Sequence, residues 1–222
     1  MERRKFLVLA TAAAALLLLA AGAVYEGLRM PKAILLDTSG YPTIGNTLAK
    51  IEMILFEDFR CSHCCTFSKE IFPQINSKYI ATGQVRYTIV PLAFLKGSKP
   101  IATAALSVFH SSPSRLVPFL DQIATRCQNG DILDERSLLG IAKGVGNINL
   151  EKLRECLDTQ CYNHELEKNL QMAHKIMGKD FGTPSLYVNG VLTSTASFRS
   201  VQARVETMVA LMDSQAEVKV SQ

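Results

Sequence analysis

The chain has 222 residues, of which 48% are hydrophobic and 20% are charged, and its formal net charge is +4 at pH 7. This length and composition are typical of one globular domain with a sizeable core. The charge is small, and the sequence has neither a basic stripe interleaved with aromatic residues nor a glycine-rich phosphate loop. The sequence therefore gives no reason to expect a nucleic-acid partner.

The N-terminus has the pattern of an export signal. A basic start, MERRK, precedes an uncharged apolar run over residues 6–24, which ends in the small residues Ala21 and Ala23. Residues 1–23 are therefore predicted to be a signal peptide or an N-terminal membrane anchor, and both interpretations stay open because the run is long enough to span a bilayer. In either case the rest of the chain is exported, to a compartment where disulfides can form.

A strand, a helix and a second strand are predicted next. Residues 51–59, IEMILFEDF, form an apolar run with flanking acids that is typical of a buried central strand. The pattern becomes helical from Ser62 to about Ala81, and Pro73 should kink that helix. A second strand follows within residues 83–94, and this order predicts two parallel strands. The inward helix positions are Phe67, Ile71, Ile75 and Tyr79.

The remainder divides into a helical block and a C-terminal hairpin with a helix. Residues 98–180 have helical periodicity throughout, with Asn149 as a candidate N-cap. Strands at 185–188 and 191–194 flank an Asn-Gly turn, and a last helix starts near Ser197. We predict a core in two parts, residues 31–97 and 181–213, split by a helical subdomain at 98–180 and followed by a polar tail at 214–222.

The segment FRCSHCCTF carries the chemistry. Cys61 stands at the start of the predicted helix, where unpaired N–H groups and the helix dipole stabilise an anion. Its pKa should therefore fall below the free value of about 8.5. Cys64 lies one turn later and can attack a mixed disulfide formed by Cys61. His63, as a cation or an N–H donor, should further stabilise the Cys61 sulfur.

Two motifs together resemble the DsbA family of thiol–disulfide oxidoreductases. LFEDFRCSHC is similar to the Cys-Pro-His-Cys region of that family, and GTPSLYVNG matches its Gly-Thr-Pro-x-x-x-Val-Asn-Gly. The resemblance implies an α/β, thioredoxin-like fold with an inserted helical subdomain. It also implies that Thr183 and a cis Pro184 flank the dithiol. No cofactor is expected, and no metal either, because Cys156 with Cys161, the only candidate second pair for a zinc site, is poorly spaced for one.

By the same resemblance, the chain would act in the periplasm and form disulfides in folding exported proteins. A DsbB-like quinone reductase in the membrane would reoxidise Cys61 and Cys64, and residues 6–24 would tether an uncleaved chain to the inner membrane. A disulfide reductase or isomerase remains an alternative activity. A non-catalytic peptide-binding module on the same scaffold is the alternative of another class.

The sequence departs from the family pattern at several positions. Ser62 replaces the usual proline of the dithiol motif. Leu55 stands six residues before Cys61, where thioredoxin-like proteins often carry a buried acid, and neither Glu57 nor Asp58 is assigned that role from sequence.

The other four cysteines are read as structural. Cys65 is interpreted as a small buried residue. One disulfide is expected among Cys127, Cys156 and Cys161. Residues five apart in a regular helix point about 140° apart, so a bond between Cys156 and Cys161 needs a helix break. This favours Cys127 with Cys156 or with Cys161, and the choice stays open.

Overall fold

The computed structural model describes residues 33–220, with side chains described to residue 214. The predicted signal or anchor at residues 1–23 lies outside the described residues. Within residues 33–220, none of the helices combines the length and the apolar character that a membrane span requires.

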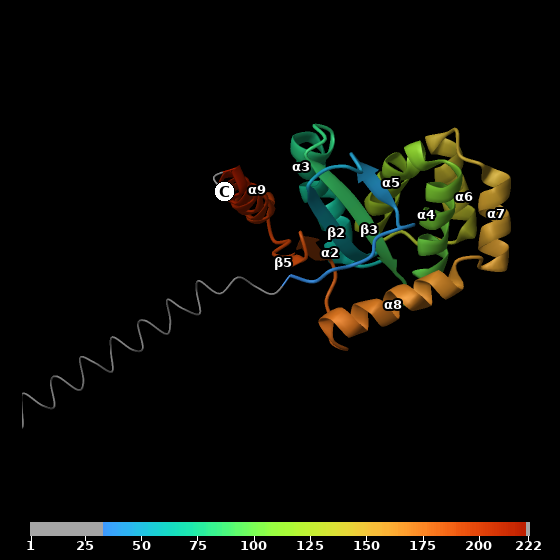
Figure 1. Ribbon diagram of the computed structural model, residues 1–222. Coiled ribbons are helices and arrows are strands. Elements are labelled where there is room, and N and C mark those ends of the chain that lie inside the picture. Colours follow the sequence, from blue (N-terminus) through green and yellow to red (C-terminus); the bar gives the residue numbers. More distant parts are fainter. Residues whose placement is uncertain (1–32, 221–222) are drawn as a thin grey trace, which may run out of the picture. The chain divides into compact units, whose positions relative to one another are not determined.

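A five-stranded mixed sheet forms the centre of the fold (Figure 1). Its strands lie in the order β1-β3-β2-β4-β5. The central pair, β2 and β3, is parallel, as predicted from the strand–helix–strand order, and the other pairs are antiparallel. The strands are β1 (Thr43–Gly45), β2 (Ile51–Asp58), β3 (Val85–Leu92), β4 (Ser185–Val188) and β5 (Val191–Thr193).

A continuous helical segment connects β2 to β3. It comprises α2 (Ser62–Thr66), the π-helical η1 (Phe67–Ile71), α3 (Phe72–Ile75) and the π-helical η2 (Asn76–Ile80). A kink was predicted at Pro73. The structure has a wide π-helical turn there, in which the Phe72 N–H donates to the Phe67 carbonyl oxygen. Pro73 has no N–H and its ring would clash with the preceding turn of a regular α-helix, so a π turn accommodates it. The four predicted inward positions are all buried.

Helices occupy the chain between β3 and β4. Asn149 begins α7 as predicted, because its side chain accepts the Lys152 N–H at 3.0 Å. The division of the chain into a split core and an inserted subdomain stays a prediction, since the part from Ala33 onwards forms one compact unit. The helices are α4 (Lys99–Ser111), η3 (Pro113–Arg115), α5 (Leu116–Gln128), α6 (Glu135–Val145), α7 (Leu150–Thr159) and α8 (Asn163–Met177).

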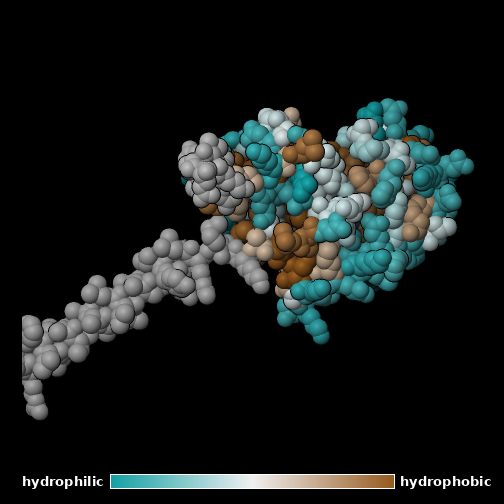
Figure 2. Space-filling view, viewed as in Figure 1, coloured by the Kyte–Doolittle hydropathy of each residue, from teal (hydrophilic) through white to brown (hydrophobic). Residues whose placement is uncertain are grey.

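Apolar side chains cover both faces of the sheet. On one face, Met53 and Leu55 of β2 join a core with the α2–η2 segment, helices α4 to α7 and α9 (Phe198–Val220). On the other face, Ile54 and Phe56 pack with Ala173 of α8. Alternate residues of β2 therefore face different layers. The outward surfaces of α6, α7 and α8 are mostly hydrophilic, while apolar residues gather near the segment that precedes β1 (Figure 2).

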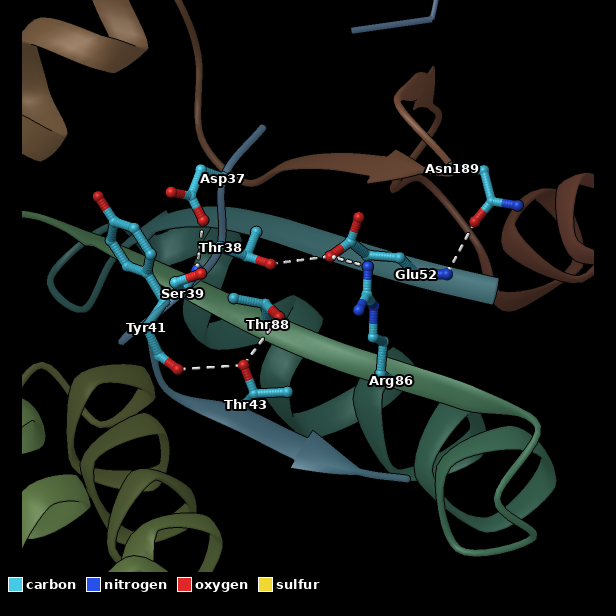
Figure 3. A network of polar contacts seen from close by, with 9 residues as sticks. All are labelled: Asp37, Thr38, Ser39, Tyr41, Thr43, Glu52, Arg86, Thr88 and Asn189. Carbon is cyan, nitrogen blue, oxygen red and sulfur yellow. Dashed lines mark hydrogen bonds and ion pairs between the residues drawn. The ribbon is translucent and has the colours of Figure 1, made fainter. Parts of the chain in front are cut away.

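The C-terminal hairpin and the segment before β1 are fastened to β2. The predicted Asn189-Gly190 turn joins β4 and β5, with positive φ at both residues. The Asn189 side chain accepts the Glu52 N–H at 2.8 Å, and the Glu52 carboxylate accepts the Thr38 hydroxyl at 2.9 Å and pairs with Arg86 at 3.0 Å (Figure 3). A side chain at residue 190 would collide with the Ile34 carbonyl oxygen, so glycine is required there. These contacts fix β4, which directly follows Thr183 and Pro184 in the chain.

Candidate active site

Cys61 occupies the turn between β2 and α2. Its backbone is extended, and it forms the N-cap of α2. Its N–H donates to the Asp58 carbonyl oxygen at 2.9 Å. The buried Asp58 carboxylate accepts the Arg60 N–H at 2.9 Å and those of Phe94 and Leu95 at 3.0 Å each. These bonds join the turn to the loop after β3 and hold Cys61 at the helix end.

The Cys61 sulfur is an acidic thiol. A hydrogen bond from the Cys64 thiol is the main cause that lowers its pKa, and the Thr183 hydroxyl and the backbone N–H groups of Cys64 and His63 act in the same direction. Partial burial opposes them, and the resulting pKa of Cys61 is about 5. At pH 7 this sulfur is therefore mostly a thiolate, the nucleophilic form.

The pKa of Cys64 is raised, whereas that of Cys61 is lowered. The Cys64 side chain is 1% exposed. Its hydrogen bond to Cys61 raises its pKa most, followed by burial and the negative charge of Glu57. One half-buried thiolate and one buried thiol that keeps its proton therefore stand one turn apart on the same helix.

The Thr183–Pro184 segment faces the dithiol. Its peptide bond is cis, and the Thr183 carbonyl oxygen lies 3.4 Å from the Cys61 sulfur. That carbonyl can accept only the proton of the thiol form, whereas the Thr183 hydroxyl can donate to the thiolate. Both residues line an open groove of about 700 Å³, together with His63, Thr66 and Glu70.

The structure thus brings together all five residues selected from sequence. His63 contributes through its backbone N–H, while its ring is exposed and makes no hydrogen bond to any residue within 33–220. A role for the His63 ring stays a prediction.

The expected cysteine pairing is wrong. Cys127 pairs with Cys65, and Cys156 pairs with Cys161. Helix α7 ends at Thr159, and Gln160 adopts a left-handed conformation with φ 51°, which supplies the helix break that brings the Cα atoms of Cys156 and Cys161 within 5.0 Å.

Cys65 is buried, as interpreted from sequence, but it also takes part in a disulfide that the sequence did not predict. Helix α2 packs against α5, which places the Cα atoms of Cys65 and Cys127 6.2 Å apart. The bond ties the helix that carries the dithiol to the helical block, directly beside Cys64.

Comparison with known proteins identifies the family. A family model described as Thioredoxin matches residues 37–207, which is most of the chain. The chain belongs to the thioredoxin family. The α/β, thioredoxin-like fold with inserted helices that was expected from the two motifs is confirmed.

Similar proteins within this family are named for disulfide bond formation or as protein-disulfide oxidoreductases. Disulfide bond formation protein D of Bacillus subtilis is 29% identical over 173 residues, covering 75% of this chain and 76% of that protein. The crystal structure of Chlamydia trachomatis DsbA has a TM-score of 0.72 at 29% identity and covers 82% of this chain and 98% of its own. Oxidised BdbD of Bacillus subtilis has a TM-score of 0.71 at 25% identity, covering 80% and 97%. The predicted DsbA resemblance is confirmed.

This thioredoxin-family chain is accordingly a protein thiol–disulfide oxidoreductase. Some relatives are longer: a protein of Rickettsia bellii is 26% identical over 167 residues, which cover 75% of this chain but 63% of that protein. The activity class is shared with the relatives, whereas the direction of electron flow, the substrates and the compartment depend on properties of this chain.

Proposed function

We propose that this chain oxidises thiols of folding exported proteins by donating the disulfide of Cys61 and Cys64. The observation that carries the proposal is the contrast between the two sulfurs. Cys61 is half-buried with a pKa of about 5, whereas Cys64 is buried with a strongly raised pKa. A thiol of low pKa is a good leaving group and makes its disulfide more oxidising.

The transfer takes two exchange steps. A substrate thiolate attacks the Cys61 sulfur, the Cys61–Cys64 bond breaks, and Cys64 leaves and takes up a proton. A second substrate thiolate then attacks the substrate sulfur of the mixed disulfide, and Cys61 leaves as a thiolate. The substrate gains one disulfide and the protein gains two electrons, so the dithiol must be reoxidised before the next cycle.

The groove beside the dithiol suits a polypeptide substrate. It is open and about 700 Å³ in volume, and residues 182–185 and 192–196 line it opposite α2 and η1. Its walls mix hydroxyl groups with the exposed Leu192, which suits many different unfolded segments better than one rigid ligand. An extended substrate segment beside Thr183 would present its cysteine to Cys61.

The compartment and the redox partner belong to the same proposal. The basic start and the apolar run at residues 6–24 support export to the periplasm, with the run either cleaved or kept as a tether to the inner membrane. Two disulfides outside the dithiol are consistent with an oxidising compartment. Reoxidation would come from a DsbB-like quinone reductase in that membrane.

Disulfide transfer to a reduced, unfolded two-cysteine polypeptide tests the proposal. The oxidised full chain should convert the substrate to its disulfide form, as counted by alkylation and mass spectrometry. Cys61→Ser should lose the activity. Cys64→Ser, mixed with a substrate activated as a mixed disulfide with glutathione, should accumulate a covalent complex through Cys61.

The matched control removes the Cys156–Cys161 disulfide. Cys156→Ser with Cys161→Ser should leave the transfer rate within about twofold, because that disulfide lies in the helical block. Transfer by Cys61→Ser at the wild-type rate would contradict the proposal.

A further inference from the structure

A cleft of about 280 Å³ opens between β3, the α2–η2 segment and the start of α5. Pro73, which follows the π-helical η1, and Pro118 on α5 both line it. A π turn and two proline rings interrupt the close packing that regular helices would make against the sheet. Neither Cys61 nor Cys64 borders this cleft, so the proposed function of the dithiol leaves it without a role.

The walls of the cleft are apolar. Phe72 and Tyr87 contribute two aromatic rings whose centroids lie 5.2 Å apart. The aliphatic residues of the lining, besides the two prolines, are Ile44, Ile89, Val117 and Leu120. Ligand pockets typically have volumes of roughly 300–1,000 Å³ and mostly apolar and aromatic walls, with a few polar groups that orient the ligand. The cleft therefore has the size and character of a site for a small organic molecule.

Two buried polar side chains line the cleft without a partner. Tyr87 is 1% exposed and Glu57 is 3% exposed, and within residues 33–220 neither side chain makes a hydrogen bond or an ion pair. Burial is the main cause that raises the pKa of Tyr87, and the charge of Glu57 adds to it, so the two groups lie close enough to interact. Buried polar groups of folded proteins usually have partners. A ligand in the cleft would supply one to both.

The charges around the cleft favour a cationic ligand. Of the described residues that line it, two are acids, Glu57 and Asp121, and none is a lysine, an arginine or a histidine. Asp121 already pairs with Lys69, which leaves Glu57 as the acid without a counter-ion. A buried carboxylate is costly unless a cation or hydrogen-bond donors face it. An ammonium group offers both a charge and three donors.

We propose that this cleft binds a small primary amine with an aromatic body. The ring lies between the apolar walls beside Phe72 and Leu120. The ammonium group pairs with the Glu57 carboxylate and donates a further hydrogen bond to the Tyr87 hydroxyl. The site is separate from the substrate groove beside the dithiol, because the two linings share no residue. Amine binding is therefore expected whether or not the chain transfers disulfides.

Three probes of nearly the same shape test the charge of the ligand. Phenethylamine carries an ammonium group, phenethyl alcohol a neutral hydroxyl and hydrocinnamate a carboxylate. Each is titrated into the oxidised full chain at pH 8.5, and binding is measured by NMR chemical shifts. At this pH Glu57, whose pKa is raised to about 8 by burial, is mostly ionised. The amine stays charged, because its pKa is close to the roughly 10.4 of lysine.

Phenethylamine should bind with a Kd of roughly 1 mM, which is realistic for so small a ligand. Phenethyl alcohol should bind about tenfold more weakly or less, because it leaves the buried carboxylate without a counter-ion. Hydrocinnamate should not bind measurably, since it would bury a second carboxylate beside Glu57. In Glu57→Gln, phenethylamine should fall by about tenfold to the level of the alcohol, while the alcohol stays within about twofold of wild type.

Two further variants control for charge and place. Glu70→Gln also removes one acid, but Glu70 lies on η1 in the substrate groove and outside the cleft. All three affinities should stay within about twofold of wild type in this matched control. Val117→Trp adds a large ring to the wall of the cleft and should abolish binding of both phenethylamine and phenethyl alcohol.

Several outcomes would overturn the inference. They are equal binding of phenethylamine and phenethyl alcohol to wild type, wild-type binding of phenethylamine to Glu57→Gln, and absence of binding by all three probes, which would mean that the cleft holds water only. Binding of phenethylamine that survives Val117→Trp would place the amine elsewhere and overturn it as well. If Glu57→Gln does not fold, as judged by urea unfolding, the wild-type preference for the amine and its loss in Val117→Trp decide the question.

Discussion

The acidity of Cys61 should make the stability of the protein depend on pH. The comparison uses a Cys64→Ser chain, in which the dithiol cannot close and serine keeps a hydroxyl hydrogen-bond donor beside Cys61. Adding Cys61→Ser removes the ionisable sulfur and leaves the rest unchanged. The free energy of unfolding of the two chains should diverge as the pH rises.

The sign follows from linkage. A thiol with a lower pKa in the folded state than in the unfolded state contributes its full stability above the unfolded pKa, and loses it as the pH falls through the folded pKa. The pKa of Cys61 falls from 9.0 to about 5. At pH 7 the two pH units above the folded value correspond to about 2.7 kcal/mol. Because Cys61 is only half-buried, solvent screening should reduce this to roughly 1.4 kcal/mol.

Urea unfolding at pH 7 and pH 4 measures the effect. The stability of the Cys64→Ser chain relative to the double variant should be about 1.4 kcal/mol greater at pH 7 than at pH 4. Glu57 also titrates, because its pKa is raised to about 8. It stabilises the folded state at low pH and loses that contribution as the pH rises through 8. Glu57 is present in both chains, so its contribution largely cancels in the comparison. A difference that stays constant between the two pH values would refute the assignment of an acidic Cys61.

Three further outcomes are expected from single features of the site. Replacing Cys65 and Cys127 together by alanine opens a loop with a sequence separation of 62 and should lower the free energy of unfolding by on the order of 4 kcal/mol in the chain-entropy model, as urea unfolding would show. His63→Ala removes the ring and keeps the backbone N–H that lowers the pKa of Cys61. If the ring stabilises the thiolate, as the sequence predicts, the thiolate absorbance of Cys61 should titrate about one to two pH units above wild type; a titration within about half a unit of wild type would contradict a role for the ring. Asp58→Ala leaves backbone N–H groups without an acceptor, so it should cost about 2–4 kcal/mol in thermal or urea unfolding; an unchanged stability would mean that water replaces the carboxylate.

The sequence predicted those features that local patterns encode. The period of Phe67, Ile71, Ile75 and Tyr79 gave the helix, and the Asn189-Gly190 pair gave the hairpin, because each depends on neighbours in the chain. The five site residues follow from two short motifs that the fold brings together.

Features that depend on tertiary packing were not predictable in the same way. The Cys65–Cys127 bond requires α2 to pack on α5, and the Cys156–Cys161 bond requires the left-handed Gln160 that ends α7. The sequence could not show either that the side chains of Glu57 and its neighbour Asp58 have different surroundings. Their difference depends on which face of β2 each occupies and on N–H groups from a loop 36 residues away.

An equilibrium with glutathione buffers tests the central claim most directly. The fraction of the Cys61–Cys64 pair that is oxidised is measured in the full chain by alkylation and mass spectrometry across a range of glutathione ratios. An oxidant with a stabilised Cys61 thiolate should have a reduction potential clearly less negative than the roughly −270 mV of thioredoxin. A value at or below about −270 mV would contradict the account and assign the chain to the reductases.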